Sequence, residues 1–185
     1  MKTLVIIAHP NMETSRVNKN WLKELEKYPE KYTVHELYKV YKEGKIDVER
    51  EQKLIDSHSN LVIQFPVYWF NCPPLLKEWL DDVLTYGWAF GSNGGNHLVN
   101  RKVALAVSAG AKQSDYSEGG KYGYTLEQLL SPFETTFLYC DADYRSFYSL
   151  YGKEEAQGAI EEDSEAEENE LTKSSREYVE FIDAL

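Results

Sequence analysis

The chain has 185 residues and a formal net charge of −11, and 42% of its residues are hydrophobic. Its length favours a single domain, and no stretch approaches the roughly 18 consecutive apolar residues of a membrane-spanning helix. Nine of the eleven net negative charges come from carboxylates in residues 154–170, so the rest of the chain is nearly neutral. This disfavours nucleic-acid binding by a basic face.

Continuous apolar runs and amphipathic segments alternate along the chain, beginning with TLVIIA at residues 3–8. This run is rich in β-branched residues and does not alternate, which is typical of a strand buried on both faces. The pattern then predicts an amphipathic helix over residues 15–27, a half-buried strand over residues 32–38 and a short polar helix over residues 47–58.

The second half of the chain repeats this order. Continuous apolar runs at residues 60–65 and 102–108 predict two more buried strands. Pro73 and Pro74 suit the first turn of a helix, because a proline there loses no intrahelical hydrogen bond. The remaining predicted elements are helices over residues 125–137 and 171–185 and a strand near residues 146–150.

This order predicts an α/β fold: a doubly wound five-stranded parallel sheet with helices on both faces. We expect residues 1–153 to form the catalytic domain. The acidic segment and terminal helix of residues 154–185 are expected to belong to the same domain. The acidic run is interpreted as a solvated linker or helix face, with binding of a partner as the alternative.

Two further features bear on the compartment of the protein. The first apolar run is too short for the core of a signal peptide, which favours a cytoplasmic location. Cys72 and Cys140 lie far apart and have no metal-type spacing. We interpret them as structural thiols in a reducing compartment, and we predict no metal site.

Ligands of doubly wound sheets bind beyond the carboxyl ends of the strands, and the first such end carries HPNMETSRVN, residues 9–18. It holds neither GxGxxG nor a Walker lysine, which disfavours a Rossmann dinucleotide loop and a P-loop. Its hydroxyls, Arg16 and the N–H groups of a helix start favour a phosphate, to which His9 could also donate. The alternative is that Thr14 or Ser15 only caps the helix.

The second strand end is FPVYWF, residues 65–70. A flavin is a flat ring with polar edges, and aromatic faces together with backbone N–H groups would suit it. The alternative interpretation is an aromatic core cluster.

The third strand end is SAGAKQSDYSEGGKYG, residues 108–123. Its small residues at 109–111 let backbone approach a ring edge closely. Tyr116 and Tyr122 offer phenol hydroxyls above such a site. The alternative here is a flexible surface loop. Because the predicted fold brings all three strand ends to one edge, we expect them to form one site.

The segments HP…TSRVN, QFPVYWFNCPPLLKEWLDDVLTYGWAFG and AVSAG…Y resemble the flavodoxin-like NAD(P)H:quinone oxidoreductases over roughly residues 1–150. The resemblance is to the small bacterial branch with the potassium-efflux ancillary oxidoreductases, the modulators of drug activity and the general stress proteins. It implies an NAD(P)H dehydrogenase (quinone), in which a flavin takes hydride from NADPH or NADH and reduces a quinone in a ping-pong reaction. FMN is favoured over FAD, because FAD-binding relatives often have longer chains.

The resemblance also implies roles for individual residues. The flavin phosphate would be held by His9, Ser15, Arg16, Val17 and Asn18. The ring would be lined by Pro66, Val67, Tyr68, Trp69 and Phe70, and its pyrimidine side would be contacted by Ser108, Ala109 and Gly110. Tyr116 would help to stabilise negative charge on the reduced ring. Tyr122 replaces a histidine of some members, and its unperturbed pKa near 10 suits a hydrogen-bond donor.

Finally, the resemblance implies a homodimer with the active site at the subunit interface. In the family an aromatic residue near Phe90 reaches over the flavin of the partner, which would partly explain Tyr86, Trp88 and Phe90. Alternatively, Trp88 and Phe90 cap their own core. Azo, nitro or FMN reduction at the same site is an alternative activity. A regulatory flavoprotein subunit, peripherally associated with a membrane potassium transporter, is an alternative function. An electron-transfer flavodoxin is disfavoured by the insertion at residues 88–90 and by the tyrosine loop.

Overall fold

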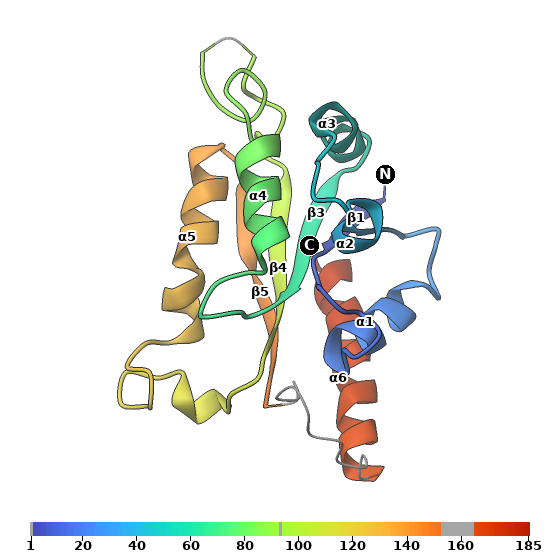
Figure 1. Ribbon diagram of the computed structural model, residues 1–185, viewed down its shortest axis with the longest axis vertical. Helices are drawn as coiled ribbons and strands as arrows, with labels where there is room; N and C mark the ends of the chain where they lie inside the picture. Colours follow the sequence, from blue (N-terminus) through green and yellow to red (C-terminus); the bar gives the residue numbers. More distant parts are fainter. Residues whose placement is uncertain (1, 93, 153–164) are drawn as a thin grey trace.

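The computed structural model describes residues 2–92, 94–152 and 165–185 (Figure 1). Within these ranges five parallel strands form one sheet in the order β2-β1-β3-β4-β5. The strands are β1 Thr3–Ile7, β2 Tyr32–Glu36, β3 Asn60–Pro66, β4 Lys102–Ala109 and β5 Asp143–Tyr151. The predicted doubly wound five-stranded parallel sheet is confirmed, and its topological switch lies between β1 and β3.

The helices of the described residues follow the strands as predicted, with two additions. They are α1 Val17–Leu25, α2 Leu37–Val40, α3 Val48–Asp56, α4 Pro74–Val83, α5 Leu126–Tyr139 and α6 Glu165–Asp183, with a 3₁₀ turn η1 at Gln113–Asp115. Helix α2 and the turn η1 were not predicted from the sequence. The predicted extension of the second strand to residue 38 is wrong, because β2 ends at Glu36 and Leu37, which is fully buried, begins α2.

The last two elements are longer than the sequence pattern indicated. Strand β5 extends beyond the predicted residues 146–150 at both ends. Helix α6 begins at Glu165 rather than near residue 171, so the end of the acidic run is helical. Acidic residues in the first turn favour a helix through its dipole, although they contribute nothing to the apolar stripe used to locate it. Residues 154–164 of the acidic run lie outside the described residues.

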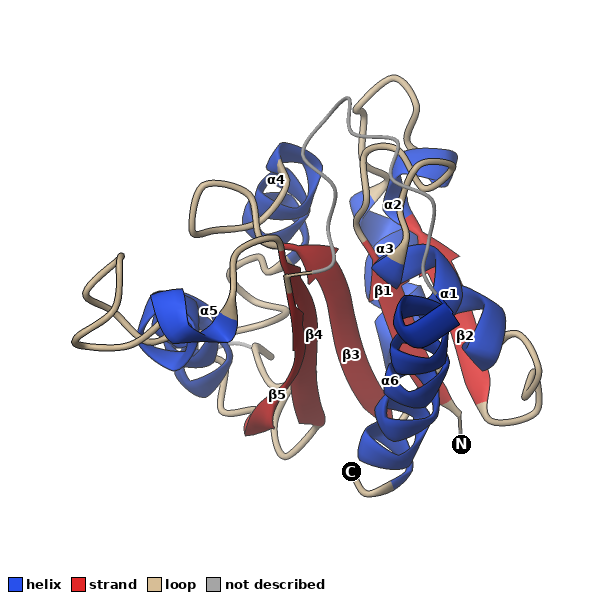
Figure 2. Ribbon diagram, turned by 90° about the horizontal axis from the view of Figure 1, so that it is seen from below, coloured by secondary structure: helices blue, strands red, loops and turns tan. Residues whose placement is uncertain are grey.

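The central strands are buried on both faces, as their continuous apolar runs predicted. In β1, Leu4 and Ile6 belong to a core shared with α3, α4 and α5. The alternate residues Val5 and Ile7 belong to a second core, which α1 and α6 complete. Figure 2 shows α1 and α6 together on one side of the sheet and α4 and α5 on the other.

The predicted helix starts are also present. Pro73 precedes α4, and Pro74 is its first residue. At α5, the hydroxyl of Thr125 accepts the N–H of Gln128, and the Gln128 side chain accepts the N–H of Thr125. This reciprocal pair is a capping box, and it sets the helix start one residue after the predicted one. No helix within the described residues combines the length with the apolar composition that a membrane crossing would require.

A buried carboxylate joins the elements on the α3–α4 side of the sheet. Glu51 is fully buried, and it accepts hydrogen bonds from His35 Nε2 at 2.9 Å, Tyr41 OH at 2.5 Å and Trp79 Nε1 at 2.8 Å. Burial by itself raises the pKa of Glu51, but the hydrogen bonds outweigh it, so the pKa lies below its ordinary value. The carboxylate therefore ties β2, α3 and α4 together.

We predict that Glu51→Gln destabilises the fold. One carboxylate oxygen becomes an NH₂ group that faces a donor, so one hydrogen bond is lost. We expect the free energy of unfolding to fall by about 2 kcal/mol. Urea denaturation measures the change. The matched control is Glu49→Gln on the same helix, whose exposed pair with Lys53 is expected to contribute less than about 1 kcal/mol. Equal effects in the two variants would contradict the role of Glu51.

The same variant has a predicted pH dependence. Because the folded pKa of Glu51 is depressed, its contribution to stability is complete above the ordinary pKa of 4.5 and is lost as the pH falls through the lower folded value. The stability difference between wild type and Glu51→Gln is therefore expected to shrink as the pH falls below 4.5. A difference that stays constant over that range would argue against a buried carboxylate.

Candidate functional site

A strained turn follows β3 at the carboxyl edge of the sheet. The backbones of Tyr68 and Asn71 exchange two hydrogen bonds of 3.0 Å, and the residues between them, Trp69 and Phe70, have φ of 49° and 61°. Turns with two positive φ values normally carry Asn-Gly, because large side chains are strained there. Trp69 is 94% exposed, so the interpretation of this segment as a core cluster is wrong for Trp69.

The loop between β1 and α1 leads to a helix N-terminus at the same edge. Helix α1 starts at Val17 after Arg16, and its first turn contains no acidic residue. The Ser15 hydroxyl accepts the N–H of Asn18 at 3.1 Å, so Ser15 does cap this helix start. A hydroxyl that accepts one bond still carries its own donor hydrogen. Capping and anion binding are therefore compatible at Ser15, and the dipole of α1 favours an anion.

His9 lies buried at the end of β1. Burial lowers the pKa of His9 to about 4, so the imidazole is neutral at neutral pH. Its Nδ1 atom lies 3.1 Å from the backbone N–H of Asn11, which donates to it. The proton of the neutral ring therefore resides on Nε2. His9 acts as a neutral hydrogen-bond donor rather than as a cation.

The ends of β3 and β4 are joined directly. The N–H of Val67 donates to the carbonyl of Ser108 at 2.8 Å, and the N–H of Gly152 donates to the carbonyl of Ala109 at 2.8 Å. Ser108 and Ala109 are fully buried, whereas Gly110 is exposed. The backbone after Ala109 therefore emerges beside the strained turn, as the predicted ring-edge contact requires.

Aromatic contacts connect the strained turn to the tyrosine loop. The ring of Phe70 lies 4.9 Å from that of Tyr122, which lies 5.1 Å from Tyr116. Tyr116 also packs on Tyr151 at 5.6 Å and is buried. Burial raises the pKa of Tyr116, so its phenol keeps its proton at neutral pH. The interpretation of a flexible surface loop therefore does not suit the segment around Tyr116.

Trp88 and Phe90 are not brought to this site within one chain. They follow α4, which runs back to the amino edge of the sheet, in the loop beyond the end of α4 in Figure 1. Trp88 is buried and stacks on His97 at 5.1 Å. Phe90 is half-buried between Tyr86 and Tyr139. Trp88 thus caps its own core, and Phe90 lies on the opposite edge from the strained turn.

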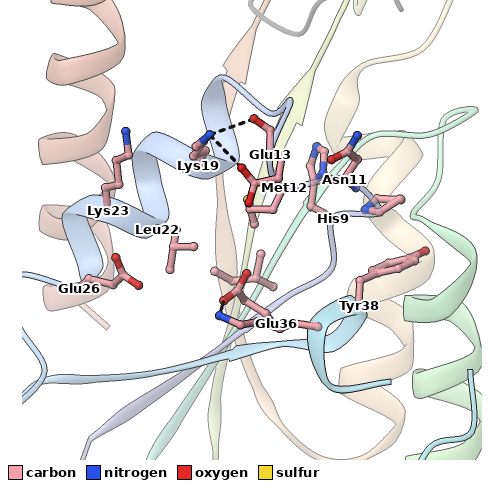
Figure 3. Close-up of a pocket in the computed structure, with 13 residues that line it drawn as sticks. His9, Asn11, Met12, Glu13, Lys19, Leu22, Lys23, Glu26, Glu36 and Tyr38 are labelled. Atoms are coloured by element: carbon pink, nitrogen blue, oxygen red, sulfur yellow. Dashed lines mark hydrogen bonds and ion pairs between the residues drawn. The ribbon is translucent and has the colours of Figure 1, made fainter. Parts of the chain in front are cut away.

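A pocket of about 510 Å³ lies beside the β1–α1 loop, between α1 and the start of α2 (Figure 3). It shares His9 with the candidate site, but no residue of the strained turn lines it. Two of its lysines are paired: Lys19 Nζ with Glu13 at 3.7 Å, and Lys39 Nζ with Glu36 at 3.2 Å. This pocket is therefore distinct from the strained turn, and it was not predicted from the sequence.

Two side chains that were not predicted from the sequence contact residues of the site from within the core. Gln64 is fully buried in β3 and bonds to Asn18, and Tyr178 of α6 bonds to Gln64. The available signal was the amide of Gln64 between the apolar residues Ile63 and Phe65, since a buried amide needs hydrogen-bond partners. Its partners are distant in sequence, so the pattern alone did not identify them.

With this geometry established, comparison with known proteins gives the family. Residues 1–173 match the protein family described as having a flavodoxin-like fold, and the chain belongs to this family. The chain is 49% identical to the uncharacterized NAD(P)H oxidoreductase YrkL of Bacillus subtilis, over 82% of this chain and 86% of YrkL. It is 40% identical to KefG of Serratia proteamaculans, a glutathione-regulated potassium-efflux system ancillary protein, over 75% of each chain.

Two solved structures are also similar. General stress protein 14 of Treponema denticola, solved in complex with FMN, has a TM-score of 0.91 and 50% identity over 100% of this chain and 99% of that one. The structure of an NADPH-quinone reductase from P. pentosaceus has a TM-score of 0.78 and 25% identity, covering 95% of this chain and 96% of that one. These similarities agree with the family that the sequence motifs resemble.

We predict that Trp69→Asn stabilises the protein in the absence of ligand. Asn tolerates the left-handed region, and the exposed ring contributes little packing, so the free energy of unfolding is expected to rise by about 0.5–1 kcal/mol. Urea denaturation measures it. Tyr124→Asn, at a 59% exposed aromatic residue whose φ is not positive, is the control and is expected to show no gain. A loss of stability at Trp69 would mean that the ring is held by packing.

Proposed function

We propose that the protein is an FMN-dependent NAD(P)H:quinone oxidoreductase, that is, an NAD(P)H dehydrogenase (quinone). The observation that carries this proposal is the strained turn at Trp69 and Phe70, which lies at the same sheet edge as the α1 N-terminus and the end of β4. The FMN complex of the Treponema protein and the names of the oxidoreductase relatives support it.

The residues present fit FMN at both of its ends. For the phosphate there are the backbone N–H of Val17, the hydroxyl of Ser15, the Nε2–H of His9 and the guanidinium of Arg16. The side chain of Asn18 is buried, and its backbone N–H donates to the Ser15 hydroxyl. For the ring there are the backbone and aromatic side chains of residues 66–70 and the emerging backbone of residues 108–110.

A bound FMN supplies the two-electron chemistry that carries a hydride from NADPH or NADH to a quinone. The exposed Trp69 and its aromatic neighbours would cover the ring face and exclude water from it. Tyr116 keeps its proton on the phenol oxygen and is proposed to donate a hydrogen bond where negative charge develops. Tyr122 packs against Tyr116 and is proposed to support it as a second donor. Azo, nitro or free flavin acceptors would use the same edge.

The C-terminal segment is proposed to be part of the same domain. The side chains of Leu171, Tyr178 and Ile182 share a core with Trp21 of α1 and with the central strands. A cytoplasmic location is also proposed, because the protein would use a nicotinamide donor. Both cysteines are free and buried, as is usual in a reducing compartment.

A homodimer is proposed because the site of one chain lacks the aromatic loop after α4. A groove of about 420 Å³ between α4 and α5 is lined by Leu80, Leu84, Phe90 and Tyr139, among others. The neighbouring side chains of Tyr86 and Leu138 are 64% and 53% exposed. Exposed apolar side chains of this kind mark association surfaces. A second copy packed on this face would bring its Phe90 towards the site.

We predict that the double variant Leu138→Glu, Tyr139→Glu is monomeric. Two carboxylates on the proposed interface cannot be buried there without partners, so dimers are expected to dissociate. Sedimentation velocity measures the oligomeric state, and quinone turnover per chain is expected to fall with it. The control is Lys42→Glu, which adds a carboxylate after α2, away from the groove. A wild-type protein that sediments as a monomer would refute the dimer.

A second function is supported by the similarity to KefG. The chain could serve as the ancillary, regulatory subunit of a potassium efflux system, with the acidic residues at the start of α6 as a contact surface. This function requires a membrane partner, whereas the reductase function requires none. Turnover by the purified chain therefore tests the reductase function. Deletion of residues 154–170 tests the regulatory one, which loss of gating with quinone reduction intact would support.

The proposed function is tested by an absorbance spectrum of the purified protein. We expect the absorption bands of a flavin, which bleach with NADPH or NADH and return with a soluble quinone. Mass spectrometry of the released cofactor is expected to identify FMN rather than FAD. Protein that stays colourless after incubation with FMN and FAD would refute the proposal.

A further inference from the structure

A continuous row of hydrogen bonds between buried side chains leads from helix α6 to the candidate site. Tyr178 OH donates to Gln64 Oε1 at 3.1 Å, and Gln64 Nε2 donates to Asn18 Oδ1 at 3.1 Å. Asn18 Nδ2 then donates to Ser108 Oγ at 2.8 Å. All four residues are fully buried, so this row of hydrogen bonds crosses the interior of the α1–α6 side of the sheet.

The direction of these bonds is determined by the groups at either end. A phenol donates readily to an amide oxygen, which leaves the Gln64 NH₂ group to face Asn18. Gln64 Nε2 also lies 3.2 Å from the backbone carbonyl of Asn18, which can only accept. The amide of Asn18 is therefore held with its oxygen towards Gln64 and its nitrogen towards Ser108.

The end of this row of hydrogen bonds that lies away from α6 coincides with the proposed FMN site. Asn18 and Ser108 come from two of the three strand ends that form the site. The backbone N–H of Asn18 also donates to Ser15 Oγ, so the position of Asn18 affects a proposed phosphate donor. Tyr178 and Gln64 themselves are buried and cannot touch a ligand at the surface.

We propose that Tyr178 and Gln64 are positioning residues for the cofactor site, an inference that rests on the proposed function. The Tyr178 hydroxyl anchors Gln64, and Gln64 holds Asn18 and the start of α1 against β4. Helix α6 is thereby a structural part of the site, although it follows the last strand. Without the hydroxyl, the buried oxygen of Gln64 loses its donor, and such a group shifts to find another.

The variant Tyr178→Phe tests this positioning role, and Tyr148→Phe is its matched control. Tyr148 OH also bonds to α6, at 3.0 Å from the carbonyl and from Oγ of Ser174, but it is not bonded to Gln64 or Asn18. Its ring stacks on Tyr178 at 5.7 Å, so Tyr148→Phe removes a hydroxyl from the same interface. A general loss of α6 packing would affect both variants.

The dissociation constant of FMN is measured on flavin-free protein by quenching of FMN fluorescence, with urea denaturation of the same samples. We expect Tyr178→Phe to weaken FMN binding by about fivefold and Tyr148→Phe by less than about twofold, at similar losses of stability. Equal affinities for wild type and Tyr178→Phe, or equal weakening in both variants, would overturn the proposal.

A second measurement does not depend on FMN. In Tyr178→Phe, hydrogen exchange of the Asn18 N–H is expected to accelerate relative to amides in the middle of α1, and in Tyr148→Phe it is expected to stay unchanged. Wild-type protein that binds no FMN would refute the proposed function. The exchange comparison still decides the positioning link, because unchanged exchange at Asn18 in Tyr178→Phe would overturn it.

Discussion

Burial of both faces of the sheet is the constraint on which the rest of this structure depends. Every residue of β1 is buried, with residues 4–7 divided between the two cores, and β3 and β4 are nearly as completely covered. Side chains within such strands have no access to solvent, so polar chemistry is confined to the strand ends. The parallel arrangement places the ends of β1, β3 and β4 at one edge, where the loops of the candidate site converge.

The same constraint makes each polar group in the interior costly unless it is hydrogen-bonded. Two of the buried polar side chains, one on each side of the sheet, illustrate how hydrogen bonds offset this cost. Glu51 receives three donors and ties β2, α3 and α4 together. Gln64 connects Asn18 with Tyr178 on the other side. Both groups have partners on several elements, so each holds segments that are distant in sequence in one arrangement.

At the surface, by contrast, the strained turn has an energetic cost that its own contacts do not offset. Two aromatic residues in the left-handed region are unfavourable by about 1–3 kcal/mol each, and the exposed ring of Trp69 recovers little of this through packing. Such strain persists where the surrounding structure enforces it and where a binding site benefits from it. The anchoring of Val67 on Ser108, one residue before the turn, supplies that enforcement.

The sequence by itself determined the succession of strands and helices along the chain, the parallel sheet and the three segments at its carboxyl edge, because these depend on local apolar runs and turn residues. It did not determine that Leu37 begins a helix, how far α6 extends, or that Phe90 lies on the opposite edge from the strained turn. Nor did it determine the bond between Tyr178 and Gln64, which joins residues 114 positions apart. Only tertiary packing decides such contacts, because a hydrogen bond between distant elements leaves no periodic pattern in either of them.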